Sequence, residues 1–199
     1  AGTNDRNGWI SRDNGMTWLE MPDRSIRAVS PTNGDIVYAF TYPAGMTDRS
    51  VLWRSENRAI SWIRQGETPF RNPVEVDIDP QDPNKLYVST GNDLYVWNGT
   101  GWTRLNIDIP VERFGTRDWR VLNIIAVDPL RPNVIYAGVN APGAGHRESF
   151  IYRSRDSGAT WEDIAHNLGT HHLVKGLAVN PHNGDVHASF SHGNYVLSP

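Results

Sequence analysis

Short apolar segments rich in β-branched residues recur along this chain of 199 residues, and each first segment of a pair ends at a proline. A short polar turn then leads into a second apolar segment of similar length. Because Pro cannot donate to a sheet ladder, the pattern predicts pairs of β-strands joined by tight turns. The first segments of the four pairs span residues 26–31, 74–80, 124–129 and 176–181, and the second segments span 36–40, 85–89, 134–138 and 186–190.

A polar turn that ends on tryptophan alternates with these strand pairs. Residues 11–18 and 154–161 share the pattern Ser-Arg-Asp-x-Gly-x-Thr-Trp, residues 55–62 carry a weaker copy, and residues 98–102 carry a copy shortened to an Asn-Gly turn. The Asp can accept hydrogen bonds from amides of its own turn and the Gly can take a positive φ, so each copy predicts a hairpin. We assign this structural role to Ser11, Asp13, Gly15, Trp18, Ser55, Asn57, Trp62, Trp102, Ser154, Asp156, Gly158 and Trp161.

Each strand pair and each Trp-terminated turn together make a unit of four strands, with a third strand entering the turn and a fourth leaving it. The unit repeats about every 45 to 55 residues, which is the size of a propeller blade. The sequence therefore predicts an all-β fold of four-stranded antiparallel sheets.

The turn motif resembles the Asp-box, or BNR repeat, of β-propeller proteins, and its copies with their flanks cover nearly the whole chain. Families that carry it include sialidases, xyloglucanases, sortilin-like receptors and photosystem II assembly factors. The resemblance implies the fold more firmly than an activity, because these families share the box and not the chemistry. In such a blade we expect the innermost strand to be the most apolar, and the box Trp to pack between neighbouring blades.

We expect one propeller domain or propeller segment over residues 1–199, of about four blades' worth of strands. Ala1-Gly2-Thr3 resembles the end of a second strand, so the chain is expected to begin with the two outer strands of a blade. Two alternatives follow: a small ring in which the last strands meet the first, or a window of a larger propeller, with other chains as possible partners. The expected blade pieces span residues 1–21, 25–65, 73–106, 121–165 and 174–199.

The composition argues against several classes of partner and does not identify a particular one. The formal net charge is −3 and no basic run interleaves with aromatic residues, so we expect no nucleic-acid partner. The chain has no Cys, which excludes disulfides and thiolate metal sites, and it has no apolar run long enough for a transmembrane helix. We expect no cofactor, and the resemblance implies a secreted, periplasmic or cell-surface location.

The connections between strands fall into a short repetitive set on one face and a long irregular set on the other. Binding residues usually lie on long loops of a rigid scaffold, so we place any ligand site among the long loops. Residues 111–120 concentrate three Arg, two acids and an unrepeated Trp, which could recognise a carboxylate, a sugar or a protein surface. The candidate binding residues there are Arg113, Arg117, Asp118, Trp119 and Arg120, and the alternative is a loop held together by Arg–Asp pairs.

All seven histidines lie between residues 146 and 192. Neutral imidazoles could form a pH-sensitive patch or share a transition metal, but no helical His spacing supports a zinc site, so we expect solvated loop residues and no metal. The candidates on the long-loop face are His146, Arg147, His171 and His172. Tyr42, with Asp48 and Arg49, is a further possible platform that a surface turn explains as well.

Other carboxylates have a structural interpretation. Asp13 and Asp156 act as turn acceptors, and Asp77, Asp79 and Asp128 are expected to begin turns before Pro rather than to bind calcium. No catalytic residue can be assigned.

The function that this pattern favours is a non-catalytic propeller module that binds a protein or glycan partner through its long loops. The alternatives are a fragment of a secreted xyloglucanase-like or sialidase-like glycoside hydrolase, for which no carboxylate pair can be matched, and a structural part of an extracellular assembly.

Overall fold

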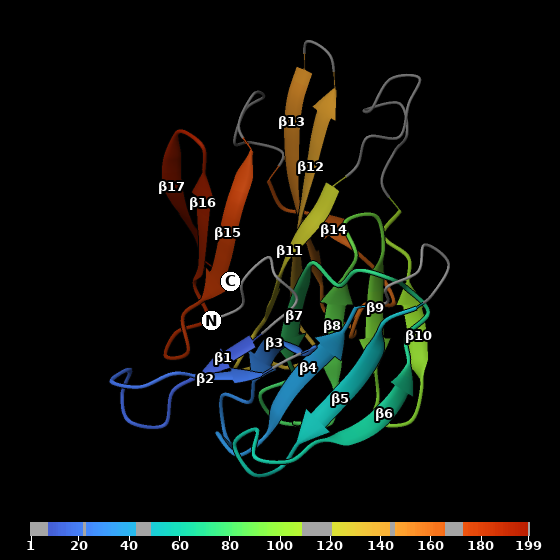
Figure 1. Cartoon of the computed structure of the whole chain (residues 1–199). Coiled ribbons are helices and arrows are strands. Elements are labelled where there is room, and N and C mark those ends of the chain that lie inside the picture. Colours follow the sequence, from blue (N-terminus) through green and yellow to red (C-terminus); the bar gives the residue numbers. More distant parts are fainter. Residues whose placement is uncertain are drawn as a thin grey trace.

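The computed structural model describes residues 8–21, 23–42, 49–108, 121–143, 146–165 and 173–198, and only the backbone of residues 141–143 and 146–148. The described residues contain strands and no helix, and the strands form five separate antiparallel sheets (Figure 1).

The first sheet is β1(Gly8–Ile10) with β2(Leu19–Met21). The second is β3(Ser25–Val29), β4(Val37–Thr41), β5(Val51–Ser55) and β6(Ile63–Glu67). The third is β7(Glu75–Ile78), β8(Leu86–Ser89), β9(Leu94–Trp97) and β10(Trp102–Leu105). The fourth is β11(Val121–Val127), β12(Ile135–Gly143), β13(His146–Ser154) and β14(Glu162–Asp163), and the fifth is β15(Val174–Val179), β16(Val186–Phe190) and β17(Gly193–Leu197).

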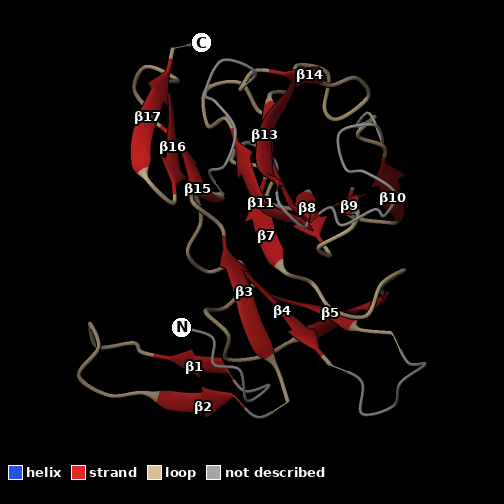
Figure 2. Cartoon of the chain, turned by 90° about the horizontal axis from the view of Figure 1, so that it is seen from above, coloured by secondary structure: helices blue, strands red, loops and turns tan. Residues whose placement is uncertain are grey.

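The predicted fold class is confirmed. Each of the three central sheets has four antiparallel strands in chain order, so consecutive strands are neighbours and every connection within a sheet is a hairpin. The sheets follow one another along an arc in Figure 2, with β3, β7, β11 and β15 on its inner side and the first and fifth sheets at its two ends. The described strands of those two end sheets share no ladder.

The most buried strand of each central sheet is its second strand rather than its innermost one. In β8 every residue is buried, and in β4 only Thr41 at the end is less than buried. In β3 only Ser25 is buried, and in β7 only Ile78 is buried. The expectation that the innermost strand is the most apolar is therefore wrong for the second and third sheets. Among the described strands, the innermost strand has a partner at one edge only, whereas the second strand has one at both edges. The residues of β8 also pack alternately with the second and the fourth sheet.

The apolar core is divided into layers between consecutive sheets. Tyr38 and Phe40 of the second sheet pack with Leu86 and Val88 of the third. Tyr87 of the third sheet packs in turn with Ile135 of the fourth. Alternate residues of one strand therefore face opposite neighbours, which is how a short strand can be buried on both sides.

Three of the turns share one hydrogen-bond arrangement. In residues 154–161, the Ser154 hydroxyl accepts from the Gly158 amide at 2.8 Å, and Asp156 Oδ1 accepts from the Thr160 amide at 2.8 Å. In residues 11–18 the equivalent distances are 2.7 Å from Gly15 N to Ser11 Oγ and 2.8 Å from Thr17 N to Asp13 Oδ1.

The weaker copy at residues 55–62 keeps this arrangement. Asn57 Oδ1 accepts from the Ser61 amide at 2.9 Å, and Ser55 Oγ accepts from the Ala59 amide at 2.9 Å. Ala59 occupies the position of the glycine and has φ 62°.

The turns at residues 55–62 and 154–161 lie beside the turn that joins the first two strands of the same sheet, and we call this side of the molecule the turn face. In the second sheet Arg58 Nε donates to Asp35 Oδ1 at 2.7 Å. In the fourth, the Ser157 amide donates to the Asn133 carbonyl at 2.9 Å. The opposite ends of the strands form the loop face.

The tryptophans of the turns differ in their surroundings. Trp161 packs against the core between the third and fourth sheets, and Trp102 packs against the core between the second and third. Trp18 is 49% exposed, so the expectation that every such ring is buried between sheets is wrong for this residue. Trp102 and Trp161 each pack against the core shared with the preceding sheet, and among the described residues no sheet precedes the first one.

None of the described segments forms a helix that is long and apolar enough to cross a membrane.

Candidate binding site on the loop face

A pocket of about 450 Å³ opens at the loop face between the third and fourth sheets. The third sheet contributes the turn between β8 and β9 and the end of β10, and the fourth contributes residues of β11 and β12. The lining residues are Asn92, Asp93, Leu94, Arg104, Leu105, Asn106, Ile107, Asp108, Leu122 and Val139.

The floor of the pocket is apolar because it is the exposed end of the core between these two sheets. Leu94, Leu122 and Val139 are buried members of that core, and Leu105 and Ile107 pack against it. The Leu122 amide also donates to the Gly91 carbonyl at 2.5 Å, so a backbone hydrogen bond fixes the two sheets to one another at the pocket.

The charged residues that line the pocket are Asp93, Arg104 and Asp108, and we call these and the polar lining residues the rim. Arg104 donates to Asp93 Oδ1 through both Nε, at 2.9 Å, and Nη2, at 2.5 Å. Arg104 pairs with Tyr95 in the antiparallel register of β9 and β10. Asp93 lies two residues before Tyr95, so its side chain is on the same face as that of Arg104 and diagonally opposite it. The Arg104 side chain is 58% exposed, so this pair is accessible to a ligand and adds little to stability.

The remaining polar residues of the lining are two asparagines and one aspartate. Asn92 and Asn106 contribute amides that can both donate and accept, and Asp108 contributes a carboxylate that accepts. An apolar floor surrounded by a few convergent polar groups is the usual composition of a ligand site.

The sequence-derived binding residues lie beyond what the structure describes. Arg113, Arg117, Asp118, Trp119, Arg120, His171 and His172 are outside the described residues, and for His146 and Arg147 the structure gives only their backbone in β13, opposite Gly143 and Pro142. These assignments therefore remain predictions. In the sequence, the first five follow Asp108, which lines the pocket.

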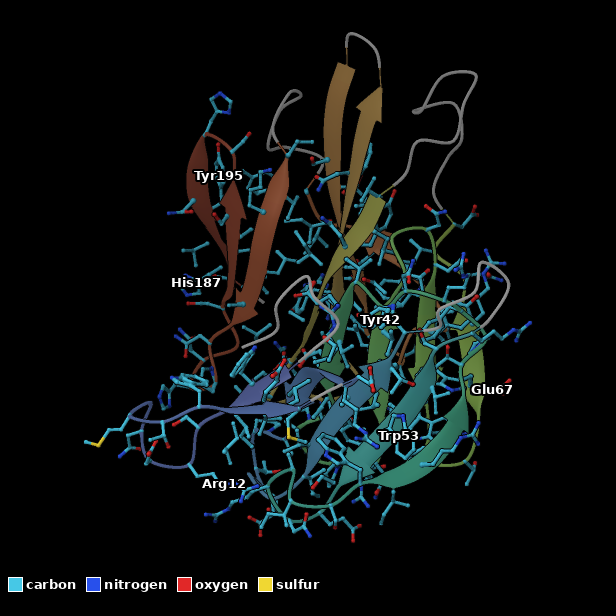
Figure 3. All side chains as sticks on the ribbon, in the orientation of Figure 1. Arg12, Tyr42, Trp53, Glu67, His187 and Tyr195 are labelled. Carbon is cyan, nitrogen blue, oxygen red and sulfur yellow. The ribbon has the colours of Figure 1, made fainter. Side chains whose placement is uncertain are left out.

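Tyr42 is occupied by an intramolecular contact. The Arg27 guanidinium donates to the Tyr42 hydroxyl, with Nε at 3.0 Å, and its Cζ lies 5.7 Å from the centroid of the Tyr42 ring. Tyr42 is labelled in Figure 3. Of its two suggested companions, Arg49 is exposed and Asp48 lies outside the described residues. The described contacts thus give Tyr42 a structural partner, and its role as a platform stays a prediction.

Two carboxyl groups with raised pKa lie on β7, apart from the pocket lining. Burial raises the pKa of Glu75 to about 7 and also raises the pKa of Asp77. Asp77 accepts from the Val127 amide at 2.8 Å, so the expectation that it begins a turn is wrong, whereas Asp79 does accept from the Gln81 amide of the following turn.

No cluster of three or more His, Asp or Glu side chains among the described residues is placed to hold a metal ion.

Comparisons with known proteins connect this architecture to solved structures. No protein-family model and no curated protein matches the sequence. An ancestral GH74 enzyme aligns with 97% of this chain and 30% of its own, at 18% identity and a TM-score of 0.68. The GH74 xyloglucanase from Xanthomonas campestris aligns with 84% of this chain and 27% of its own, at 18% identity and a TM-score of 0.61. YCF48 from Cyanidioschyzon merolae aligns with 98% of this chain and 63% of its own, at 19% identity and a TM-score of 0.59.

These neighbours are β-propellers. The chain has a β-propeller fold. Its five sheets correspond to blades or parts of blades, and the chain spans 30% of the ancestral GH74 enzyme and 63% of YCF48. At these identities the likeness establishes the fold and leaves the ligand open.

The sequence interpretation did not single out the pocket residues Asp93, Arg104 and Asp108. A signal was present, because an Asp and an Arg stand at the outer ends of the predicted hairpin around residues 98–102, where antiparallel pairing brings them together.

Proposed function

We propose that this chain is a propeller binding module that holds a segment of a protein or glycan in the pocket between the third and fourth blades. The observation that carries the proposal is the pocket itself, a space of about 450 Å³ with a buried apolar floor and an accessible Arg104–Asp93 pair on its rim. This volume lies within the range that small-ligand sites occupy, roughly 300 to 1,000 Å³.

The chemistry of the rim suits an uncharged ligand that is rich in hydrogen-bonding groups. The lining contains two carboxylates and one guanidinium, and the guanidinium is already paired. A further anion would have to displace Asp93 from Arg104, whereas peptide amides or sugar hydroxyls can use Asn92, Asn106 and Asp108 without breaking that pair.

The structural neighbours support both classes of ligand. YCF48 has been solved with a bound D1 peptide, at a TM-score of 0.53 and 17% identity to this chain, and GH74 contains a xyloglucanase. We further propose that the three equivalent turns are Asp-boxes, because they share the hydrogen bonds of the Ser hydroxyl and the Asp or Asn side chain. The resemblance that suggests Asp-boxes also suggests a location outside the cytoplasm.

The test is a ligand screen on the whole chain with two probe sets, xyloglucan oligosaccharides and a library of unmodified decapeptides, followed by NMR mapping. We expect one set to bind and to shift the methyl signals of Leu94, Leu122 and Val139. Arg104→Ala should weaken that binding, because the guanidinium has N–H groups beyond the two bonded to Asp93 that can donate to the ligand.

Arg58→Ala is the matched control, because it removes an Arg–Asp pair of similar accessibility on the turn face. Equal effects of both substitutions, or methyl shifts confined to the turn face, would reject the pocket as the ligand site.

The glycoside hydrolase alternative requires a carboxylic acid that is held protonated beside the substrate. Among the described residues, the carboxyl groups with raised pKa are those of Glu75 and Asp77, and both accept backbone hydrogen bonds from β11. Release of reducing sugar from xyloglucan by the purified chain, lost on substitution of a single pocket carboxylate, would favour the enzyme over the binding module.

A further inference from the structure

The inner edge of β11 is held by side chains of the neighbouring blade. β11 is the first strand of the fourth sheet and pairs with β12 alone in that sheet, so its other edge has no strand beside it in a ladder. On that edge the Ile125 amide donates to Glu75 Oε2 at 3.0 Å, and the Val127 amide donates to Asp77 Oδ2 at 2.8 Å.

The two contacts match in spacing. Glu75 and Asp77 are two residues apart on β7, so their side chains leave the same face of the third sheet, and the two amides are two residues apart on β11. The two carboxyl groups therefore accept the hydrogen bonds that a neighbouring strand would otherwise accept at this edge of β11. We call these four groups the β7–β11 joint.

The same two sheets line the pocket. Leu122, at the loop end of β11, lines the pocket and donates to Gly91 of the third sheet, and Ile125 of the joint is three residues further along the strand. The joint and the Leu122–Gly91 hydrogen bond together determine how β11 lies against the third sheet.

The charged groups around the joint favour its protonated form. On β7 itself, Asp77 repels a charge on Glu75 and Asp79 repels a charge on Asp77. β11 brings no charged side chain, β8 places Ser89 and Tyr87 opposite the two acids, and Lys85 is turned to Asp79 at 3.3 Å. β3, the other strand packed against β7, has Arg27 as its charged residue, and Arg27 donates to Tyr42. Among the described residues of these strands, no cation therefore compensates the two carboxylates.

The next interface along the arc uses an uncharged equivalent. Asn140 Oδ1 accepts from the Val174 amide at 2.9 Å, and Asn140 Nδ2 donates to the Val174 carbonyl at 3.0 Å. Asn140 thus holds the first strand of the fifth sheet as the two acids hold the first strand of the fourth, but without a titratable group.

We propose that the β7–β11 joint is a proton-sensitive connection between two blades, closed while its acids are protonated and released as they ionise. The amide hydrogen bonds favour the ionised acids, but burial outweighs them and raises both pKa values. Ionised carboxylates in this half-buried site are therefore drawn to water and repel one another, which opens the joint.

The direction of the pH dependence follows from the difference in proton affinity between the closed and the open joint. The folded joint raises the pKa of Glu75 from 4.5 to about 7, so the closed form binds protons more tightly than the open form does. The contribution to closure is complete below pH 4.5 and is lost as the pH rises through about 7. The raised pKa of Asp77 acts in the same direction.

Amide hydrogen exchange of the whole chain without ligand, followed by NMR and corrected for the intrinsic pH dependence, tests the joint. Between pH 5.5 and 8.5 we expect protection at Ile125 and Val127 to fall on the order of tenfold, while protection at Val174 stays constant. Glu75→Gln with Asp77→Asn keeps the shape of the side chains and should abolish the change.

Asn140→Asp should transfer a pH dependence to Val174. Protection at Ile125 and Val127 that does not change with pH in the unmodified chain, or an equal fall at Val174, would overturn the proposal.

If the pocket binds a ligand as proposed above, opening of the joint should lower the affinity of the pocket for that ligand at high pH. This consequence rests on the proposed function. Because the exchange measurement needs no ligand, a pH-sensitive joint beside a pocket that binds nothing would overturn the proposed function and leave the joint intact.

Discussion

Two copies of one turn, at residues 11–18 and 154–161, have the same hydrogen bonds and different surroundings. Asp13 accepts from the Thr17 amide at 2.8 Å and Asp156 accepts from the Thr160 amide at 2.8 Å. Yet Trp18 is 49% exposed, while Trp161 packs against the core between the third and fourth sheets. The loop conformation is therefore encoded locally, and the burial of its Trp depends on the neighbouring sheet.

The largest expected difference between the copies is in their tryptophans. Trp161→Ala removes a partly buried ring from the core and should lower the free energy of unfolding by about 3 kcal/mol, below the upper range for a fully buried Trp. Trp18→Ala should cost less than about 1 kcal/mol, because half of the ring is already in water. Urea unfolding of both variants measures the difference, and equal losses would contradict the role assigned to the neighbouring sheet.

The glycines of the two turns should differ next, although both have positive φ. Gly158 has φ 94° and a methyl group there would lie 2.5 Å from Leu105 Cδ1, whereas Gly15 has φ 88° and meets nothing closer than 3.9 Å. Gly158→Ala should cost about 2 kcal/mol, from backbone strain and displacement of Leu105. Gly15→Ala should cost about 1 kcal/mol from the strain alone, and thermal unfolding of the pair compares the two costs.

The same division between local and long-range interactions explains how much of the fold could be predicted. Strand pairs that end at Pro, and turns with Ser, Asp and Gly at fixed positions, are local signals, and they gave the fold class correctly. The exposure of Trp18 was not predictable because it depends on which sheet lies beside it. The buried position of β4 and β8, rather than of the innermost strands, likewise depends on how the sheets are arranged.

The candidate site was less predictable for a similar reason. The Arg104–Asp93 pair follows from the register of one hairpin and could have been inferred from the sequence. The hydrogen bonds of Glu75 and Asp77 join residues 50 positions apart and end on backbone amides, which any residue but Pro carries, so no residue type marks the partner.

A third pair of measurements should show no difference between the two turns. A hydrogen bond from the Thr17 hydroxyl lowers the pKa of Asp13 to about 2, and one from the Thr160 hydroxyl lowers the pKa of Asp156 to about 2. Each carboxylate therefore stabilises its turn fully above pH 3.8, and this contribution is lost as the pH falls through about 2. NMR titration of the two side chains should give matching curves, and Thr17→Val and Thr160→Val should raise the two pKa values equally.

If one of the two carboxyl groups titrated near pH 4 while the other remained near 2, the surroundings would influence even the hydrogen bonds of the turn, and the division between local turn and neighbouring sheet would have to be abandoned.

The smallest expected effect is at the weaker copy, where Ala59 occupies the glycine position with φ 62° and is 2% exposed. Ala59→Gly removes backbone strain of about 1 to 2 kcal/mol, but it also removes a buried methyl group and makes the unfolded chain more flexible, which together cost about the same amount. We therefore expect the free energy of unfolding to change by less than about 0.5 kcal/mol, measured by urea unfolding beside Gly158→Ala. A large gain in stability would mean that Ala59 is strained and poorly packed, and a large loss would mean that its methyl group fits a space that the neighbouring residues provide. Only a near-zero result agrees with a turn whose hydrogen bonds fix the backbone and whose neighbours decide which side chain is tolerated there.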